Sequence, residues 1–132
     1  MDRQKITPIV AEDAPKPAAA YSQAVTVDGW LYCSGQIAMD PNTGEMVPNA
    51  DIVAQTTQVM SNLQAVLRAA GCDFHDVVKV TVFLTDMSEF SKMNEVYSRF
   101  INLSVPPARA CVAVAALPRN ASVEIELVAK LR

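Results

Sequence analysis

The spacing of hydrophobic and polar positions predicts that the chain begins with strands. Residues 11–20 contain Pro15 and Pro17 and are expected to form an extended lead-in rather than a helix. Residues 21–27 and 30–39 are predicted strands. They flank Asp28-Gly29, a dipeptide typical of two-residue hairpin turns.

The period then changes to that of a helix. From Ile52 to Ala70, apolar residues recur at the three- and four-residue spacing that places them on one helical face. Asp51 or Asn49 is expected to cap the start of this helix, and Gly71 is expected to end it.

The second half of the chain predicts a strand, a helix and two further strands. Residues 77–84 are rich in β-branched side chains and are predicted to form a central strand. A second helix is expected to begin near Asp86, and its apolar face would consist of Phe90, Met93, Val96, Tyr97 and Phe100. Residues 109–115 and 122–130 are predicted to be strands that pair as a hairpin through the turn at residues 117–120.

This order of elements predicts an α+β domain that comprises residues 1–132. A mixed sheet would carry both helices on one face, and the other face would be left uncovered by this chain. Apolar residues make up 51% of the sequence and charged residues only 19%. Since that is an apolar surplus for a small domain, we expect another subunit to cover part of the surface.

Charge and cysteine content exclude several classes of function. The net charge is −3, and no run of Lys or Arg exceeds one residue, so nucleic acid is a disfavoured partner. The first residues lead into no apolar run long enough for a signal peptide or membrane span, and we expect a cytoplasmic protein. Cys33, Cys72, Cys111 and the single His75 are scattered, which predicts neither a metal site nor a disulfide framework.

Arg109 is the first candidate for chemistry, because it opens an otherwise apolar strand. A buried guanidinium requires an anionic partner. That partner could be Glu124 or Glu126 of this chain, in an internal ion pair, or the carboxylate or phosphate of a ligand. The two glutamates alternate with apolar residues, as in a half-exposed strand, although a glutamate beside a bound imine or carbonyl could activate water.

Four other residues are weaker candidates. Asn94 borders the apolar face of the second predicted helix, where a polar amide needs partners. Tyr21 and Ser34 lie on the first predicted hairpin, and neither carries a nucleophile motif. Cys111 lacks an evident activating base, so an inert packed thiol is the favoured interpretation.

Together these residues resemble a known family. The resemblance extends from about residue 14 to residue 131 and rests on the segments Ser34-Gly35-Gln36-Ile37, 40–45, 62–71, 77–86, 93–97, Pro107-Ala108-Arg109, Leu117-Pro118 and 123–126. The family comprises the Rid proteins, reactive intermediate deaminases that are also called YjgF or L-PSP proteins. One departure is Ala19-Ala20, where the family commonly has Gly-Pro before the residue that matches Tyr21.

The resemblance implies a chorismate-mutase-like (YjgF-type) fold assembled as a homotrimer with ligand clefts between subunits. It implies a hydrolase that converts imines such as 2-iminobutanoate and 2-iminopropanoate, formed from enamines such as 2-aminoacrylate, to 2-oxo acids and ammonia. Arg109 would hold the substrate carboxylate and Glu124 would position water. Tyr21, Ser34, Asn94 and Cys111 would line the pocket, and neither a cofactor nor a metal would be needed.

Two alternatives stay open from the sequence. The chain could be a non-catalytic sensor that binds small carboxylates, or it could act as a ribonuclease or translation inhibitor, as described for relatives. The acidic net charge counts against the second alternative.

Overall fold

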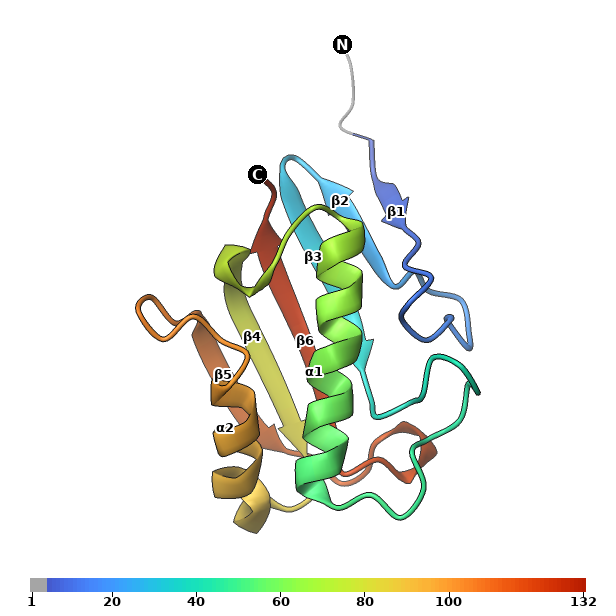
Figure 1. The fold of residues 1–132 in the computed structure, drawn as a ribbon, viewed down its shortest axis with the longest axis vertical. Helices are drawn as coiled ribbons and strands as arrows, with labels where there is room; N and C mark the ends of the chain where they lie inside the picture. The colour runs from blue at the N-terminus through green and yellow to red at the C-terminus, as the bar shows by residue number, and fades with distance from the viewer. Residues whose placement is uncertain (1–4) are drawn as a thin grey trace.

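The computed structural model describes residues 5–132 as one six-stranded sheet with two α-helices on one face (Figure 1). The sheet order is β1-β2-β3-β6-β4-β5. The elements are β1 (Thr7–Ile9), β2 (Ala24–Val27), β3 (Trp30–Gln36), α1 (Ile52–Ala69), β4 (Val77–Leu84), α2 (Phe90–Ser98), β5 (Ala108–Ala113) and β6 (Val123–Lys130). This is the predicted α+β class.

Local signals form the first hairpin and the first helix as predicted. Asp28 and Gly29 have φ values of 53° and 81°, so both occupy the left-handed conformation that a two-residue hairpin turn between β2 and β3 requires. Helix α1 is capped by Asp51, whose side chain accepts a hydrogen bond from the backbone N–H of Ala54 at 2.9 Å. Gly71, at a φ of 75°, follows the end of α1.

Some predicted bounds were too long. Strand β2 begins at Ala24 rather than at residue 21, and β3 ends at Gln36 rather than at residue 39. Strand β1 was not predicted, and it forms the edge of the sheet beside β2. Helix α2 begins after a 3-10 turn that Asp86 caps through the backbone N–H of Ser88.

The predicted hairpin between the last two strands is wrong. Strand β5 pairs in parallel with β4, whereas β6 lies between β3 and β4 and is antiparallel to both. The connection from β5 to β6 crosses the end of β4, where Val114 N–H donates to the carbonyl of Leu84 and Thr85 N–H to that of Ser122. Strand β6 is central because its inward side chains, Val123, Ile125, Leu127 and Ala129, are all buried and apolar.

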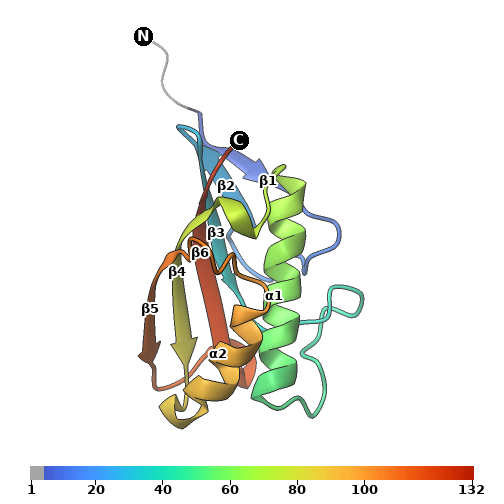
Figure 2. The same ribbon diagram turned by 60° about the vertical axis from the view of Figure 1, so that its left-hand side comes forward.

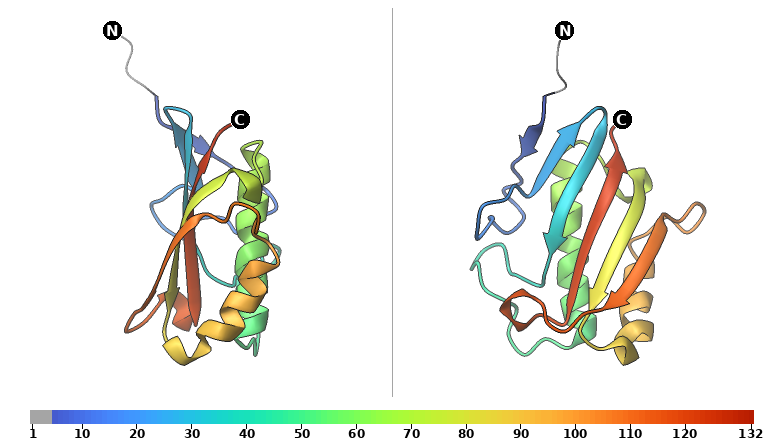
Figure 3. Two further views of the ribbon diagram at one scale, coloured as in Figure 1. Left: turned by 90° about the vertical axis from the view of Figure 1, so that its left-hand side faces the viewer. Right: turned by 180° about the vertical axis from the view of Figure 1, so that it is seen from behind.

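Both helices cover the same face of the sheet, as predicted (Figures 2 and 3). Leu31, Val82 and Ile125 point toward the helices and have no exposed surface. The opposite face is open, as seen from behind in Figure 3. Tyr32 and Val112 lie on this open face and are 46% and 43% exposed. The chain alone therefore leaves apolar side chains of the sheet in contact with solvent.

No helix in residues 5–132 combines the length and the apolar character that crossing a bilayer requires.

Candidate active site

Arg109 projects from the edge strand β5 toward helix α2. Its register partner on β4 is Val80, which is buried beneath the helices. Arg109 Nη1 donates a hydrogen bond to Asn94 Oδ1 at 2.6 Å. The guanidinium carbon lies 4.8 Å from the centre of the Tyr97 ring and 5.5 Å from that of Phe90. Helix α2 supplies all three contacts, so it fixes the guanidinium in place.

No carboxylate of the described residues lies within ion-pairing distance of Arg109; the ion pairs found there involve other cations. The internal ion pair with Glu124 or Glu126, which the sequence left open, is therefore not formed. Asn94 supplies an oxygen without a compensating charge. Arg109 consequently keeps a net positive charge that a ligand carboxylate could neutralise.

A hollow of about 320 Å³ is lined in part by Arg109, and we call it the Arg109 pocket. It is lined by Asn94, Tyr97, Ser98, Ile101, Leu103, Pro106, Pro107 and Arg109. Its walls are the C-terminal half of α2 and the segment that leads from α2 into β5.

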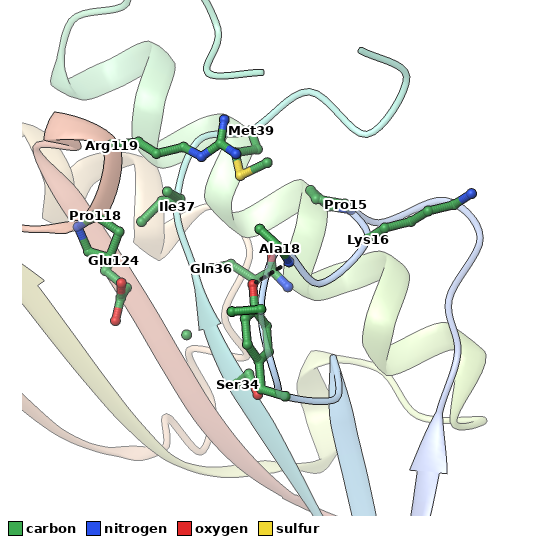
Figure 4. Close-up of a pocket in the computed structure, with 13 residues that line it drawn as sticks. Pro15, Lys16, Ala18, Ser34, Gln36, Ile37, Met39, Pro118, Arg119 and Glu124 are labelled. Carbon is green, nitrogen blue, oxygen red and sulfur yellow. Dashed lines mark hydrogen bonds between the residues drawn. The ribbon is translucent and has the colours of Figure 1, made fainter. Parts of the chain in front are cut away.

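Glu124 lies in a different cleft, where β3 ends and β6 begins (Figure 4). This cleft, the Glu124 pocket, has a volume of about 350 Å³ and is lined by Pro15, Lys16, Ala18, Ala19, Tyr21, Ser34, Gly35, Gln36, Ile37, Met39, Pro118, Arg119 and Glu124. Its lining is mostly apolar, and Glu124 is its acidic group. In Figure 4 the side chain of Lys16 points away from the other labelled residues.

A β-bulge shapes the wall beside Glu124. The pairing of β3 with β6 shifts between Cys33 and Gln36, so Ser34 and Gly35 form the irregular step. A Cβ atom at Gly35 would lie 2.6 Å from Glu124 Oε2. A residue without a side chain is thus required for the carboxylate to lie against the backbone. Gly35 was not singled out as a candidate, although an isolated glycine inside a predicted strand is a signal for a bulge.

Burial raises the pKa of the Glu124 carboxyl above its usual range, and the neighbouring charge of Glu126 raises it further. Both glutamates alternate with the buried residues of β6, so they point away from the helices. Of the two, Glu124 is half-buried and Glu126 is exposed. The raised pKa makes Glu124 a candidate for proton transfer to and from a bound ligand.

Tyr21 and Ser34 both lie in the Glu124 pocket. The Ser34 hydroxyl donates to the backbone carbonyl of Ser22 at 2.6 Å, which leaves its oxygen free to accept a hydrogen bond. The Tyr21 hydroxyl accepts a hydrogen bond from Ala18 N–H at 3.4 Å, drawn as a dashed line in Figure 4. The alanines that replace Gly-Pro at residues 19–20 are thus compatible with a tyrosine that lines this pocket.

Cys111 lies two residues beyond Arg109 on β5, with the buried Val82 as its register partner. Burial raises the pKa of its thiol, and the charge of Arg109 opposes that rise only in part. A thiol in this state is a poor nucleophile at neutral pH, which supports the inert interpretation.

The candidate residues thus form two groups in one chain. Asn94, Arg109 and Cys111 lie on the helix side of the sheet near the β5 edge, and Tyr21, Ser34 and Glu124 lie in the Glu124 pocket. Residues 5–132 contain no cluster of three or more His, Cys, Asp or Glu side chains that could hold a metal ion.

The sequence profile of the family described as endoribonuclease L-PSP matches residues 11–131. The chain belongs to the L-PSP family. It is 49% identical over 116 residues to a mouse (Mus musculus) protein named 2-iminobutanoate/2-iminopropanoate deaminase, and the match covers 88% of this chain and 84% of the mouse protein.

Solved structures of L-PSP relatives share the fold. YyfA of Yersinia pestis, described as a Rid-family protein of unknown function, has a TM-score of 0.92 at 42% identity, with 96% of this chain and 100% of that chain covered. E. coli TdcF with bound serine has a TM-score of 0.88 at 36% identity, with 96% and 99% covered. Relatives of this L-PSP chain therefore carry deaminase, Rid and endoribonuclease names.

Proposed function

We propose that this protein is an imine deaminase, a hydrolase that converts 2-imino acids to 2-oxo acids and ammonia. The observation that carries the proposal is the uncompensated charge of Arg109, held by Asn94 and by the faces of two aromatic rings. A fixed guanidinium fork is suited to a planar carboxylate. The mouse relative named as a deaminase of 2-iminobutanoate and 2-iminopropanoate supports substrates of this size.

Glu124 is the proposed proton carrier. A protonated imine is already electrophilic, so the protein needs only to orient it and to deliver water. Glu124 accepts a proton from water as the oxygen bonds to the imine carbon. The proton then passes to nitrogen, the C–N bond breaks, and loss of the hydroxyl proton to the departing ammonia leaves a 2-oxo acid and ammonium. A raised pKa suits Glu124 to both transfers.

We infer that the complete site forms between subunits of a homotrimer. Arg109 and Glu124 lie on opposite faces of the sheet, so one subunit does not bring them together. A neighbour would supply the Glu124 pocket, with Tyr21 and Ser34, against the Arg109 pocket, with Asn94 and Cys111. The exposed apolar side chains of the open sheet face provide surface for such an assembly.

The test couples the purified protein to an amino-acid oxidase that generates imines in situ, with semicarbazide as the trap. The wild-type protein should lower the rate of semicarbazone formation. Arg109→Ala should abolish this effect, and Arg109→Lys should lose most of it, because an ammonium lacks the guanidinium fork. The matched control is Arg99→Ala, which removes an exposed arginine paired with Glu95 at the end of α2.

Full activity in Arg109→Ala would overturn the proposal. A wild-type protein that binds 2-oxo acids without lowering semicarbazone formation would instead be a sensor. RNA cleavage that persists in Arg109→Ala through further purification would favour the ribonuclease alternative.

A further inference from the structure

Most of the buried polar side chains among the described residues line one pocket or bind segments next to its lining. Within residues 5–132 they are Gln23, Gln36, Gln55, Thr56 and Asn62, each less than a tenth exposed. Four of the five are carboxamides, and none is charged. Gln36 itself lines the Glu124 pocket. The other three carboxamides bind segments that line this pocket or adjoin its lining residues.

Gln23 holds the N-terminal wall. Its Oε1 accepts from Ala11 N–H at 2.7 Å, and its Nε2 donates to the carbonyls of Ala11 at 3.0 Å, Ala14 at 3.4 Å and Pro15 at 2.8 Å. Pro15 begins the segment that lines the pocket as far as Tyr21. Because Gln23 follows Tyr21 by two residues, its amide ties both ends of this loop together.

Asn62 holds the wall opposite, from helix α1. Its Nδ2 donates to the carbonyls of Ile37 at 3.3 Å and Met39 at 2.9 Å, and both residues line the pocket. Its Oδ1 accepts from Gln58 Nε2 at 2.9 Å, so the amide is satisfied on both sides. The segment that follows the β3 bulge is thereby fixed to the helix.

Gln55 holds the start of β6. Its Oε1 accepts from Ser122 N–H at 2.9 Å, and its Nε2 donates to the Ser122 hydroxyl at 3.3 Å and to the Ala50 carbonyl at 3.2 Å. Ser122 lies between Arg119 and Glu124, which both line the pocket. The backbone that presents Glu124 is therefore tied directly to α1.

We propose that Gln23, Gln55 and Asn62 are positioning residues for the Glu124 pocket, and we call them the carboxamide scaffold. Each fixes a separate segment at or beside the pocket, mainly through backbone groups, and none is a proposed proton carrier. Carboxamides do not titrate, so the walls keep their geometry over the pH range in which Glu124 gains and loses its proton. This inference depends on the proposed function only where turnover is the measurement.

Fold stability alone is the competing explanation for buried amides, and Thr56 provides the control. It lies on the same helix as Gln55 and Asn62, has no exposed surface, and its hydroxyl has no hydrogen-bond partner. Thr56→Val keeps its shape and should affect neither the pocket nor turnover.

The experiment compares Gln23→Met, Gln55→Met and Asn62→Leu with Thr56→Val in the full chain. The first measurement is a carbon-13 NMR titration of the Glu124 carboxyl, together with hydrogen exchange of the amides of residues 11–21, 37–39 and 121–124. The scaffold variants should shift the Glu124 titration toward that of an exposed glutamate and speed exchange in the segment that each one loses. The second measurement is kcat and KM for imine deamination well below Tm, where kcat/KM should fall about 10-fold or more because the carboxylate is misplaced.

Folded scaffold variants that keep both the wild-type Glu124 titration and the wild-type kcat/KM would overturn the proposal. An equal loss in Thr56→Val would also overturn it, because the effect would then be one of general stability. If Gln23→Met does not fold, Gln55→Met and Asn62→Leu carry the same test for their own segments. If the wild-type protein shows no deamination, the proposed function fails, whereas the titration and exchange still decide on the scaffold.

Discussion

Arg109 and Glu124 lie on opposite faces of the same sheet, although the strands that carry them both pair with β4. Arg109 is in register with Val80 and Glu124 with Phe83. Because side chains alternate along β4, residues three apart point to opposite sides. Arg109 reaches Asn94 on α2, whereas Glu124 projects away from the helices. A site that needs both residues needs two copies of the chain.

Mixed oligomers test whether one site combines residues of two subunits. Arg109→Ala and Glu124→Gln subunits should each be inactive alone, yet a co-refolded equal mixture should recover about a quarter of wild-type activity, since each intersubunit site then has an even chance of drawing each intact half. Imine turnover of the mixture measures the recovery. A mixture as inactive as its parents would contradict a site that combines Arg109 of one subunit with Glu124 of another, and unmixed samples refolded separately are the control.

Substitution of Glu124 should lower imine turnover and increase the stability of the fold. Burial and Glu126 raise the Glu124 pKa in the folded protein, so folding disfavours the ionised form. In the unfolded chain the carboxyl ionises near pH ~4.3. Below that pH it is neutral in both states, and as the pH rises through the folded pKa the folded protein loses stability relative to a neutral residue. Glu124→Gln should therefore stabilise the fold at neutral pH and have little effect near pH ~3.

Urea denaturation at the two pH values measures the difference. The protein with Glu124 and the Glu124→Gln variant are both studied in the Arg109→Ala background, so that no Arg109 of a neighbouring subunit affects the carboxylate. Equal stability of the two forms at neutral pH would show that Glu124 carries no burial cost.

Gly35→Ala should impair catalysis while the fold survives. The added Cβ would lie 2.6 Å from Glu124 Oε2 and 2.9 Å from Cδ, and the flexible carboxylate can swing aside. Displacement of a catalytic group by about 1 Å can cost on the order of 100-fold in rate, and we expect a fall in kcat of that order. In a Glu124→Gln background the same change should add little, because the two substitutions act on one group. Additive losses would assign Gly35 another role.

Asn94→Asp should raise KM for imine acids. A carboxylate at this position would pair with the Arg109 guanidinium and neutralise the charge that the substrate needs. Interactions with charged groups are each worth about 1.5–3 kcal/mol, so KM should rise roughly 10-fold or more. Glu95→Gln, which removes an exposed carboxylate next to Asn94 on α2, is the control and should leave KM unchanged. An unchanged KM in Asn94→Asp would show that Arg109 does not bind the substrate carboxylate.

Most of the elements and of the candidate residues could be predicted from the sequence. The period of α1, its Asp51 cap and the Asp28-Gly29 turn depend on neighbouring residues, so they could be predicted locally. Motif resemblance supplied Tyr21 and Ser34, and the structure places both in the Glu124 pocket, apart from Arg109 of the same chain. Gly35 was missed as a site residue, because its role is visible only in its contact with Glu124.

The order of the strands, and with it the division of the site, depends on long-range packing and could not be predicted from local signals. The local turn signal suggested that β5 pairs with β6. Pairing depends, however, on which strand carries the most apolar side chains to bury, because that strand takes the centre of the sheet. Strand β6 carries an uninterrupted inward row of buried apolar side chains, so it lies between β3 and β4, and β5 is left at the edge. That placement puts Arg109 against α2, separates it from Glu124, and leaves its charge available to a ligand.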